Sequence, residues 1–177
     1  MAAPEIPIDI DPATGIWSTD GLPMMYLPRH FMVNMQKAVE AKIGPAAYRD
    51  IVYASSDLSA LQWCRAEAKT HALAPLETFR HYLKRMSQRG HGQVSIEALD
   101  VKAGTGSIVA RHSAFALGYW HEAGRCVCYV FQGSFAGGMR YLLECVGRGG
   151  EPVCHEVACA ASGATEYRFE LRCEAVG

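Results

Sequence analysis

Four cysteines near the C-terminal end of the chain are the side chains best suited to chemistry. They lie close in sequence to one glutamate and one histidine, in the set Cys126, Cys128, Cys154, His155, Glu156 and Cys159. Thiolate, imidazole and carboxylate groups are the ligands that hold zinc in proteins. Cysteine is also a common small apolar residue of protein cores. The density of cysteine here exceeds what core filling needs, so metal binding and packing both remain open.

The strand expected around Glu156 sets a geometric condition on such a site. Side chains alternate between the faces of a strand, so Glu156 and Cys159 point to opposite faces unless a bulge or the strand end intervenes. The other three cysteines, Cys64, Cys145 and Cys173, are assigned to core filling. All seven lie in predicted helices and strands, and an odd count at such positions favours reduced thiols over a disulfide framework.

No catalytic motif accompanies these residues. The sequence lacks the nucleophile elbow GxSxG, the Walker phosphate loop, a GxGxxG after a strand, and the HExxH and HxxxH patterns. Four histidines, His30, His71, His81 and His91, are therefore assigned to surface or hydrogen-bonded positions. We assign no catalytic residue and expect a binding protein rather than an enzyme.

Small and bulky residues together could enclose a ligand. Small side chains at positions such as Ala110, Ala114 and Gly137 leave space that larger ones must fill. Candidate ligand-contacting residues are Trp63, His112, Trp120, Phe131, Phe135 and Tyr167. His112 is expected mid-strand among small apolar side chains, where it lines a cavity or is a hydrogen-bonded core histidine. Ordinary core packing would use the same aromatic residues.

The composition excludes two classes of partner. The chain has 17 Lys and Arg against 18 Asp and Glu, a formal net charge of −1, without the basic stripe that nucleic acid or an anionic membrane requires. The N-terminus resembles no signal peptide, and no stretch reaches the roughly 20 apolar residues of a membrane span. We therefore expect a cytoplasmic protein.

The apolar pattern predicts the elements that position these residues. Residues 1–28 contain five prolines and little periodicity, which indicates an extended arm. Residues 29–177 form a single domain, which we expect to begin with helices. The expected helix boundaries are an end at Gly44, a start at Pro45, a cap at Ser56 or Asp57, a start at Pro75 and an end at Gly90.

The second half of the chain predicts strands around one further helix. Two hairpins are expected, at residues 94–117 and 153–172, with a fifth helix from Cys126 to Val146 between them. Gly133 and Gly137 lie on one face of that helix and permit close approach, which we expect to be to the sheet. The fold class is therefore α+β, with N-terminal helices on an antiparallel sheet.

The stretch from residue 126 to 171 resembles the end of a 4-vinyl reductase (4VR) domain. Its matching positions are Cys128, Gly133, Gly137, Gly147-Arg148 and the Glu156-Val157-Ala158-Cys159 motif. The upstream phrase KIGPAAYRDIVYASSDLSA is similar to the helical entry of the same domains, so the likeness covers residues 35–172. The resemblance implies a fold shared with a family of vesicle-tethering subunits, frequent dimers, and a ligand between the helices and the sheet.

The resemblance also implies a zinc site with one ligand missing. In metal-binding members a cysteine, a glutamate and two later cysteines hold the ion, which carries over to Cys128, Glu156 and Cys159. The final cysteine falls on Tyr167, and a phenol is a poor zinc ligand. Either Cys126, Cys154 or His155 completes the site, or zinc is lost. We favour loss, and assign no cofactor, with zinc as the alternative.

These observations predict a sensor or accessory protein that binds an apolar or aromatic metabolite. We expect a homodimer, because the proline-rich arm cannot fold alone and the first helix carries surplus methionine. An enzyme is a candidate downstream partner. Two other roles stay open: an accessory or enzymatic component of a redox pathway, such as tetrapyrrole reduction or oxidative demethylation, and a structural adaptor.

Overall fold

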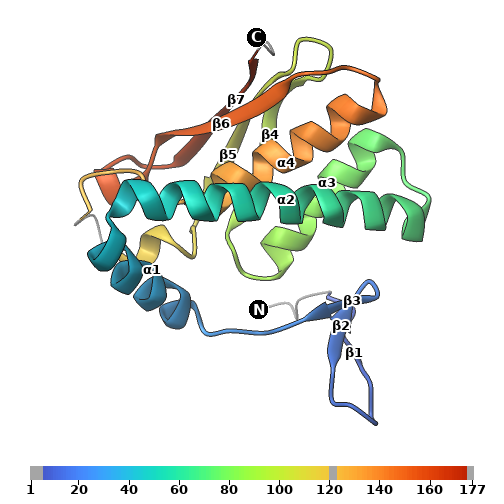
Figure 1. Ribbon diagram of the computed structural model, residues 1–177, viewed down its shortest axis with the longest axis horizontal. Coiled ribbons are helices and arrows are strands. Elements are labelled where there is room, and N and C mark those ends of the chain that lie inside the picture. Colours follow the sequence, from blue (N-terminus) through green and yellow to red (C-terminus); the bar gives the residue numbers. More distant parts are fainter. Residues whose placement is uncertain (1–5, 120–122, 175–177) are drawn as a thin grey trace.

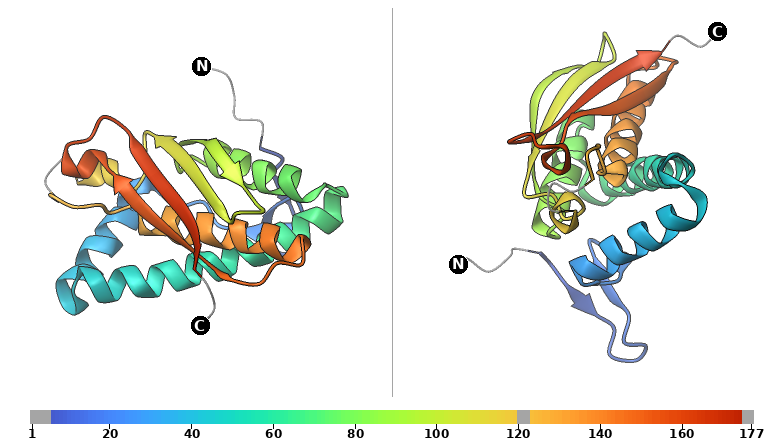
Figure 2. Two further views of the ribbon diagram at one scale, coloured as in Figure 1. Left: turned by 90° about the horizontal axis from the view of Figure 1, so that it is seen from above. Right: turned by 90° about the vertical axis from the view of Figure 1, so that its left-hand side faces the viewer.

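The domain consists of a helical layer against one face of a four-stranded sheet (Figures 1 and 2). The computed structural model describes residues 6–119 and 123–174. The helices are α1 (Arg29–Ile43), α2 (Pro45–His71), α3 (Pro75–Gln88) and α4 (Tyr129–Cys145). The predicted α+β class, with helices on an antiparallel sheet, is confirmed.

The sheet joins the two predicted hairpins edge to edge. Its strands are β4 (Gln93–Asp100), β5 (Thr105–Arg111), β6 (Glu151–Ala158) and β7 (Tyr167–Glu174), in the order β4-β5-β7-β6 with every pair antiparallel. In β7 the side chains of Tyr167, Phe169 and Leu171 are buried while their neighbours are not. This alternation turns one face of the sheet toward helix α4.

Helix α2 is continuous, so the predicted break at Ser56 or Asp57 is wrong. Asp57 does not cap a new helix, because its carboxylate pairs with Arg140 of α4, with Oδ2 2.6 Å from the Arg140 Nη2 atom. The residues on both sides of Asp57 have ordinary helical propensity, and no proline or glycine interrupts the stretch. The helix expected at Cys126 begins three residues later, at Tyr129.

The glycine face of α4 packs against α2 and not against the sheet, which corrects the predicted contact. A Cβ atom placed on Gly133 would overlap the main-chain oxygen of Tyr53, and one on Gly137 would overlap that of Asp57. The two helix backbones approach so closely that only the hydrogen atom of a glycine, and no side chain, fits at these two positions. Helix α4 therefore lies between α2 and the sheet, and most of its residues are buried.

The N-terminal arm contains a small sheet in addition to extended chain. Strands β1 (Asp9–Ile10), β2 (Trp17–Thr19) and β3 (Leu22–Met24) pair in sequence order. Asp20 and Gly21 form the turn between β2 and β3 with φ angles of 54° and 77°, the left-handed pair that a two-residue hairpin turn requires. Figure 1 shows this sheet on the side of the helices away from the four-stranded sheet.

Two short 3-10 turns, η1 (Ala116–Gly118) and η2 (Ala160–Ser162), follow strands β5 and β6. No helix in the described part of the chain is long and apolar enough to span a membrane.

Candidate functional site

Three residues that the sequence marked as metal ligands converge in space. The Cys128 and Cys159 sulfur atoms and a Glu156 carboxylate oxygen all lie within 4.8 Å of one another, and all three residues are buried. Cys128 directly precedes α4, Glu156 lies in β6, and Cys159 follows the last residue of that strand. The pairing register of β6 with β7 shifts between Glu156 and Ala158. Alternation along a regular strand would point Glu156 and Cys159 to opposite faces. The register shift and the end of the strand remove that restriction.

The carboxylate of Glu156 is incompletely satisfied. Its Oε2 atom accepts a hydrogen bond of 2.9 Å from the Cys128 main-chain N–H. Its Oε1 atom is buried and has no hydrogen-bond partner within the described residues. Burial, followed by the charge of Cys159, raises the pKa of the Glu156 carboxyl to about 9. An unpaired buried carboxylate oxygen beside two thiols is an arrangement that a bound cation would satisfy.

The thiols of the cluster are linked to one another. Hydrogen bonds from the Cys126 and Cys128 thiols lower the pKa of the Cys159 thiol. Burial raises the pKa of Cys128, whose sulfur lies 3.1 Å from the Ser113 hydroxyl oxygen. Cys159 is therefore the thiol of the cluster that accepts hydrogen bonds from the other two.

Of the three residues proposed to complete the site, only Cys126 contacts the cluster, although its sulfur does not lie within 4.8 Å of all three ligand atoms. Its thiol donates to the main-chain oxygen of Glu156 at 3.2 Å and also hydrogen-bonds to Cys159. Cys154 is buried two residues before Glu156, its ligand atom does not join the converging set, and His155 is exposed. Two converging thiols and one carboxylate, with the Cys126 thiol adjoining them, are donor types that zinc uses, so these residues fit the ion in kind.

Tyr167 lies beside the cluster without replacing the missing cysteine. Burial, followed by the nearby Cys128 and Cys159 thiols, raises the pKa of its phenol to about 12. The phenol stays protonated at neutral pH and is unsuited to metal ligation. Strand β7 has Tyr167 where the resemblance expects a cysteine. The additional thiol beside the cluster is that of Cys126, in the segment before α4.

The predicted aromatic residues do not form one wall. Phe131 and Phe135 stack with ring centroids 5.4 Å apart, and the Phe169 ring meets Phe135 edge-on at 5.0 Å. All three are fully buried and fill the space between α4 and the sheet, where a pocket was expected. Trp63 instead contacts α3, where its ring lies 4.9 Å from that of Tyr82.

Two further candidates fall outside this core. His112 lies one residue beyond the end of β5, in a left-handed conformation with φ of 56°, and its side chain is exposed. Its expected position mid-strand is therefore wrong, because the strand ends at Arg111. Trp120 lies outside the described residues.

A cavity of about 260 Å³ lies between the arm and the body of the domain. Its lining residues are Met24, Met25, Tyr26, Leu27, Arg29, Met32, Arg89, Gly90, His91, Ala114 and Phe115. The wall is mostly apolar, with polar atoms from two arginines and a histidine. The Phe115 ring lies 5.5 Å from that of Phe131, so the cavity adjoins the aromatic core.

Arg89 is the polar group of this cavity that the sequence did not mark. Its Nε and Nη2 atoms are buried and have no hydrogen-bond partner in residues 6–119 and 123–174. Burial lowers the pKa of its guanidinium, which lies 5.7 Å from the Trp63 ring centroid. Of the methionines that line the cavity, only Met32 belongs to the first helix, whose surplus methionine underlies the expected dimer contact.

A larger and more open hollow of about 710 Å³ lies between α3 and β4, and its lining includes the charged residues Arg80, Lys84 and Glu97. It offers neither the apolar enclosure nor the unsatisfied polar atoms of the smaller cavity.

Solved structures resemble this chain, and two of them illustrate the likeness. The phenol-responsive sensory domain of the transcription activator PoxR, crystallised with phenol, matches with a TM-score of 0.78 and 15% sequence identity, covering 94% of this chain and 84% of that one. A trafficking protein particle complex subunit 3 from Naegleria fowleri, covalently bound to palmitic acid, matches with a TM-score of 0.50 and 9% identity, covering 83% and 95%. At these identities the likeness establishes a shared fold alone.

The family described as "Domain of unknown function (DUF5943)" matches residues 2–97. No curated protein sequence matches the chain.

Proposed function

We propose that this chain, which belongs to the family of the domain of unknown function DUF5943, is a sensor or accessory protein that binds a small aromatic metabolite. The observation that carries the proposal is the largely apolar cavity beside the arm, lined in part by Arg89, whose Nε and Nη2 atoms have no hydrogen-bond partner among the described residues. A buried donor without a partner costs free energy, and a ligand with an acceptor oxygen recovers it. The fold shared with a phenol-responsive sensory domain supports this ligand class.

The cavity has the size and lining for a single-ring compound. Its wall of methionine, Tyr26 and Phe115 side chains offers apolar and polarizable contact to an aromatic ring. Arg89 and His91 supply donors at one side, which would fix the position of a hydroxyl or carboxylate on the ring. This location differs from the sequence-based pocket between helices and sheet, where Phe131 and Phe135 occupy the space.

A structural zinc ion at the cysteine cluster is part of the proposal. Cys126, Cys128, Glu156 and Cys159 would hold it, and the unpaired Glu156 oxygen supports this over loss of the metal. The ion would fasten the end of β6 to the residues preceding α4. The convergence of Cys128, Glu156 and Cys159 also supports membership of the 4-vinyl reductase class.

A homodimer is the proposed assembly. Exposed apolar side chains concentrate in the arm and α1, and include Ile10, Trp17, Met25 and Phe31. A second copy of the chain is the partner that would cover them symmetrically.

Ligand binding is tested by thermal shift and calorimetric titration with phenol and a panel of monocyclic aromatic acids. We expect at least one compound to stabilise the protein, and Arg89→Met to weaken that compound at least 10-fold. Arg80→Met, which replaces an exposed arginine of α3 outside this cavity, is the control. Failure of every compound, or equal binding by Arg89→Met, would contradict the proposal. A purified protein coloured by flavin or haem would favour the redox alternative.

A further inference from the structure

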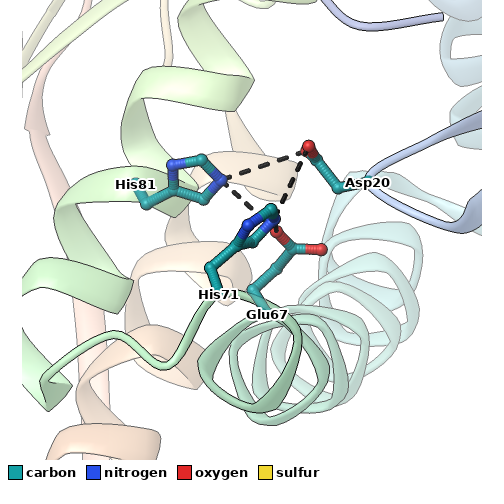
Figure 3. A group of neighbouring side chains, drawn as sticks. All are labelled: Asp20, Glu67, His71 and His81. Atoms are coloured by element: carbon teal, nitrogen blue, oxygen red, sulfur yellow. Dashed lines mark ion pairs between the residues drawn. The ribbon is translucent and has the colours of Figure 1, made fainter.

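A second group of metal-binding side chains lies where the arm meets the helices, remote in sequence from the cysteine cluster. It comprises Asp20 in the β2–β3 turn, Glu67 and His71 on α2, and His81 on α3. Figure 3 shows all four side chains pointing toward one another from these three elements. One ligand atom from each lies within 4.8 Å of all the others.

The interatomic distances are compatible with a shared ion. The Nε2 atoms of His71 and His81 lie 3.1 and 3.3 Å from the same Oε2 atom of Glu67. The same nitrogens lie 3.7 and 4.0 Å from the Asp20 carboxylate oxygens, too far for hydrogen bonds. Ligands about 2.0 Å from a tetrahedral zinc ion lie about 3.3 Å from one another. The two separations from Glu67 match this value, and the Asp20 oxygens lie slightly farther out.

Glu67 gives the independent indication of a missing partner. Its side chain is 0% exposed, and neither carboxylate oxygen has a hydrogen-bond partner in the part of the chain described. The buried Nε2 atom of His81 also has none there, although it lies beside the Glu67 oxygen. Two unpaired carboxylate oxygens and a ring nitrogen so close together are unfavourable unless a positive charge lies between them.

Nearby arginines compensate only part of this charge. Arg85 makes two hydrogen bonds of 2.7 Å to the two oxygens of Asp20, which positions that carboxylate and leaves a lone pair on each oxygen. Arg85 and Arg89 both affect the electrostatics of Glu67 but make no hydrogen bond to it. An ordinary ion-pair network therefore accounts for Asp20 and not for Glu67.

We propose that Asp20, Glu67, His71 and His81 bind a divalent first-row transition metal ion that fastens the arm to helices α2 and α3. Two imidazoles and two carboxylates suit zinc, iron, nickel or copper and lack the thiolates of the cysteine cluster. Glu67 and His71 are one helical turn apart on one face of α2, and the antiparallel return of α3 brings in His81. The Asp20-Gly21 turn closes the site from the arm.

The two proposed metal sites differ in ligand chemistry, which allows each to be observed alone. The full chain would be freed of metal by a chelator and titrated with Co²⁺, followed by displacement with Zn²⁺. Cobalt at the cysteine cluster gives strong thiolate charge-transfer absorption, whereas cobalt bound by nitrogen and oxygen gives only weak ligand-field bands. Native mass spectrometry counts the ions per chain.

The decisive variants are His71→Ala and Glu67→Gln, with His30→Ala as the exposed-histidine control. We expect wild type and His30→Ala to bind one ion more than the two variants, or to bind it at least 10-fold more tightly, with charge-transfer absorption unchanged. Without metal, Glu67→Gln should be as stable as wild type or more stable, because it removes an unpaired buried charge.

A second measurement separates metal binding from folding. Hydrogen exchange of residues 17–24 should slow when the ion binds wild type and should not change in His71→Ala. Equal ion counts and affinities in all four proteins would overturn the proposal. Destabilisation of metal-free Glu67→Gln would also overturn it, since Glu67 would then act through direct contacts.

Discussion

The carboxylate of Glu156 accepts a 2.9 Å hydrogen bond from the main-chain N–H of Cys128, which joins strand β6 to the residue before helix α4. These residues are far apart in sequence, and the contact holds the carboxylate beside the thiols of Cys128 and Cys159 while its Oε1 atom has no hydrogen-bond partner among the described residues. The same contact fixes the start of α4 relative to the sheet.

Loss of a thiol from this cluster should remove a metal and loosen the C-terminal hairpin. We expect Cys159→Ser to lose the thiolate-to-cobalt absorption and to lower the melting temperature, because metal binding and local folding are coupled. Cys145 is exposed, so its expected core position is wrong, and Cys145→Ser removes a thiol outside the cluster and should change neither property. A cobalt spectrum of Cys159→Ser identical to that of wild type would contradict the proposed zinc site.

Larger side chains at the α2–α4 contact should destabilise the protein. Gly133→Val and Gly137→Val would each drive a side chain into the main chain of α2, which cannot move without separating the two helices. We expect a loss of more than about 2 kcal/mol in the free energy of unfolding, measured by chemical denaturation. Gly149→Val serves as the control, because its Cβ would meet open space. Equal denaturation midpoints for all three variants would show that the contact has no packing role.

The spacing of apolar residues predicted most helices and strands, because the buried side chains recur at regular intervals along each element. The alternation of Tyr167, Phe169 and Leu171 identified β7, and the helical spacing after Tyr129 identified α4. The break proposed at Asp57 failed because a capping residue type was interpreted without its tertiary partner, an arginine far along the chain. Local signals cannot distinguish an aspartate that caps from one that forms an ion pair.

The candidate sites also contain some residues that the sequence could identify and others that it could not. Cys128, Glu156 and Cys159 were identified because a family motif specifies their spacing, although their convergence depends on a register shift that the sequence does not reveal. His71 and His81 were assigned as ordinary histidines, since their approach depends on the packing of α2 against α3. The Asp20-Gly21 dipeptide was a usable hairpin signal that the proline-rich context of the arm obscured.

The imidazole of His91 should make stability depend on pH on the acid side. Burial lowers the pKa of His91 below its usual value of 6.5, and its Nδ1 atom lies 3.2 Å from the main-chain oxygen of Met86. The unfolded chain therefore binds a proton at a higher pH than the folded chain does. Stability attributable to the neutral imidazole is present above pH 6.5 and declines as the pH falls below it.

Replacement of His91 by an uncharged residue should remove this dependence. We expect His91→Gln to lose less stability than wild type between pH 7 and pH 5, with the difference limited to about 1.4 kcal/mol per pH unit for one proton. Urea denaturation at several pH values measures it, with exposed His30→Gln as control. Parallel stability curves for wild type and His91→Gln would show that His91 titrates alike in both states.

Self-association should depend on the exposed apolar residues of α1. Phe31 and Met35 lie one helical turn apart with 49% and 40% of their surfaces exposed, next to an arm that carries further apolar side chains. Burying such a patch against a second copy would remove apolar surface from water on both subunits at once. Sedimentation equilibrium at micromolar concentration should therefore report twice the chain mass of 19.3 kDa.

The double variant Phe31→Lys with Met35→Lys should weaken the dimer at least 10-fold while the melting curve of the monomer stays cooperative. Leu58→Lys, a charge placed on an equally exposed position of α2 at 56%, should leave the dimer intact. A monomeric wild type at that concentration would refute the dimer, and dissociation by Leu58→Lys alone would move the interface to α2.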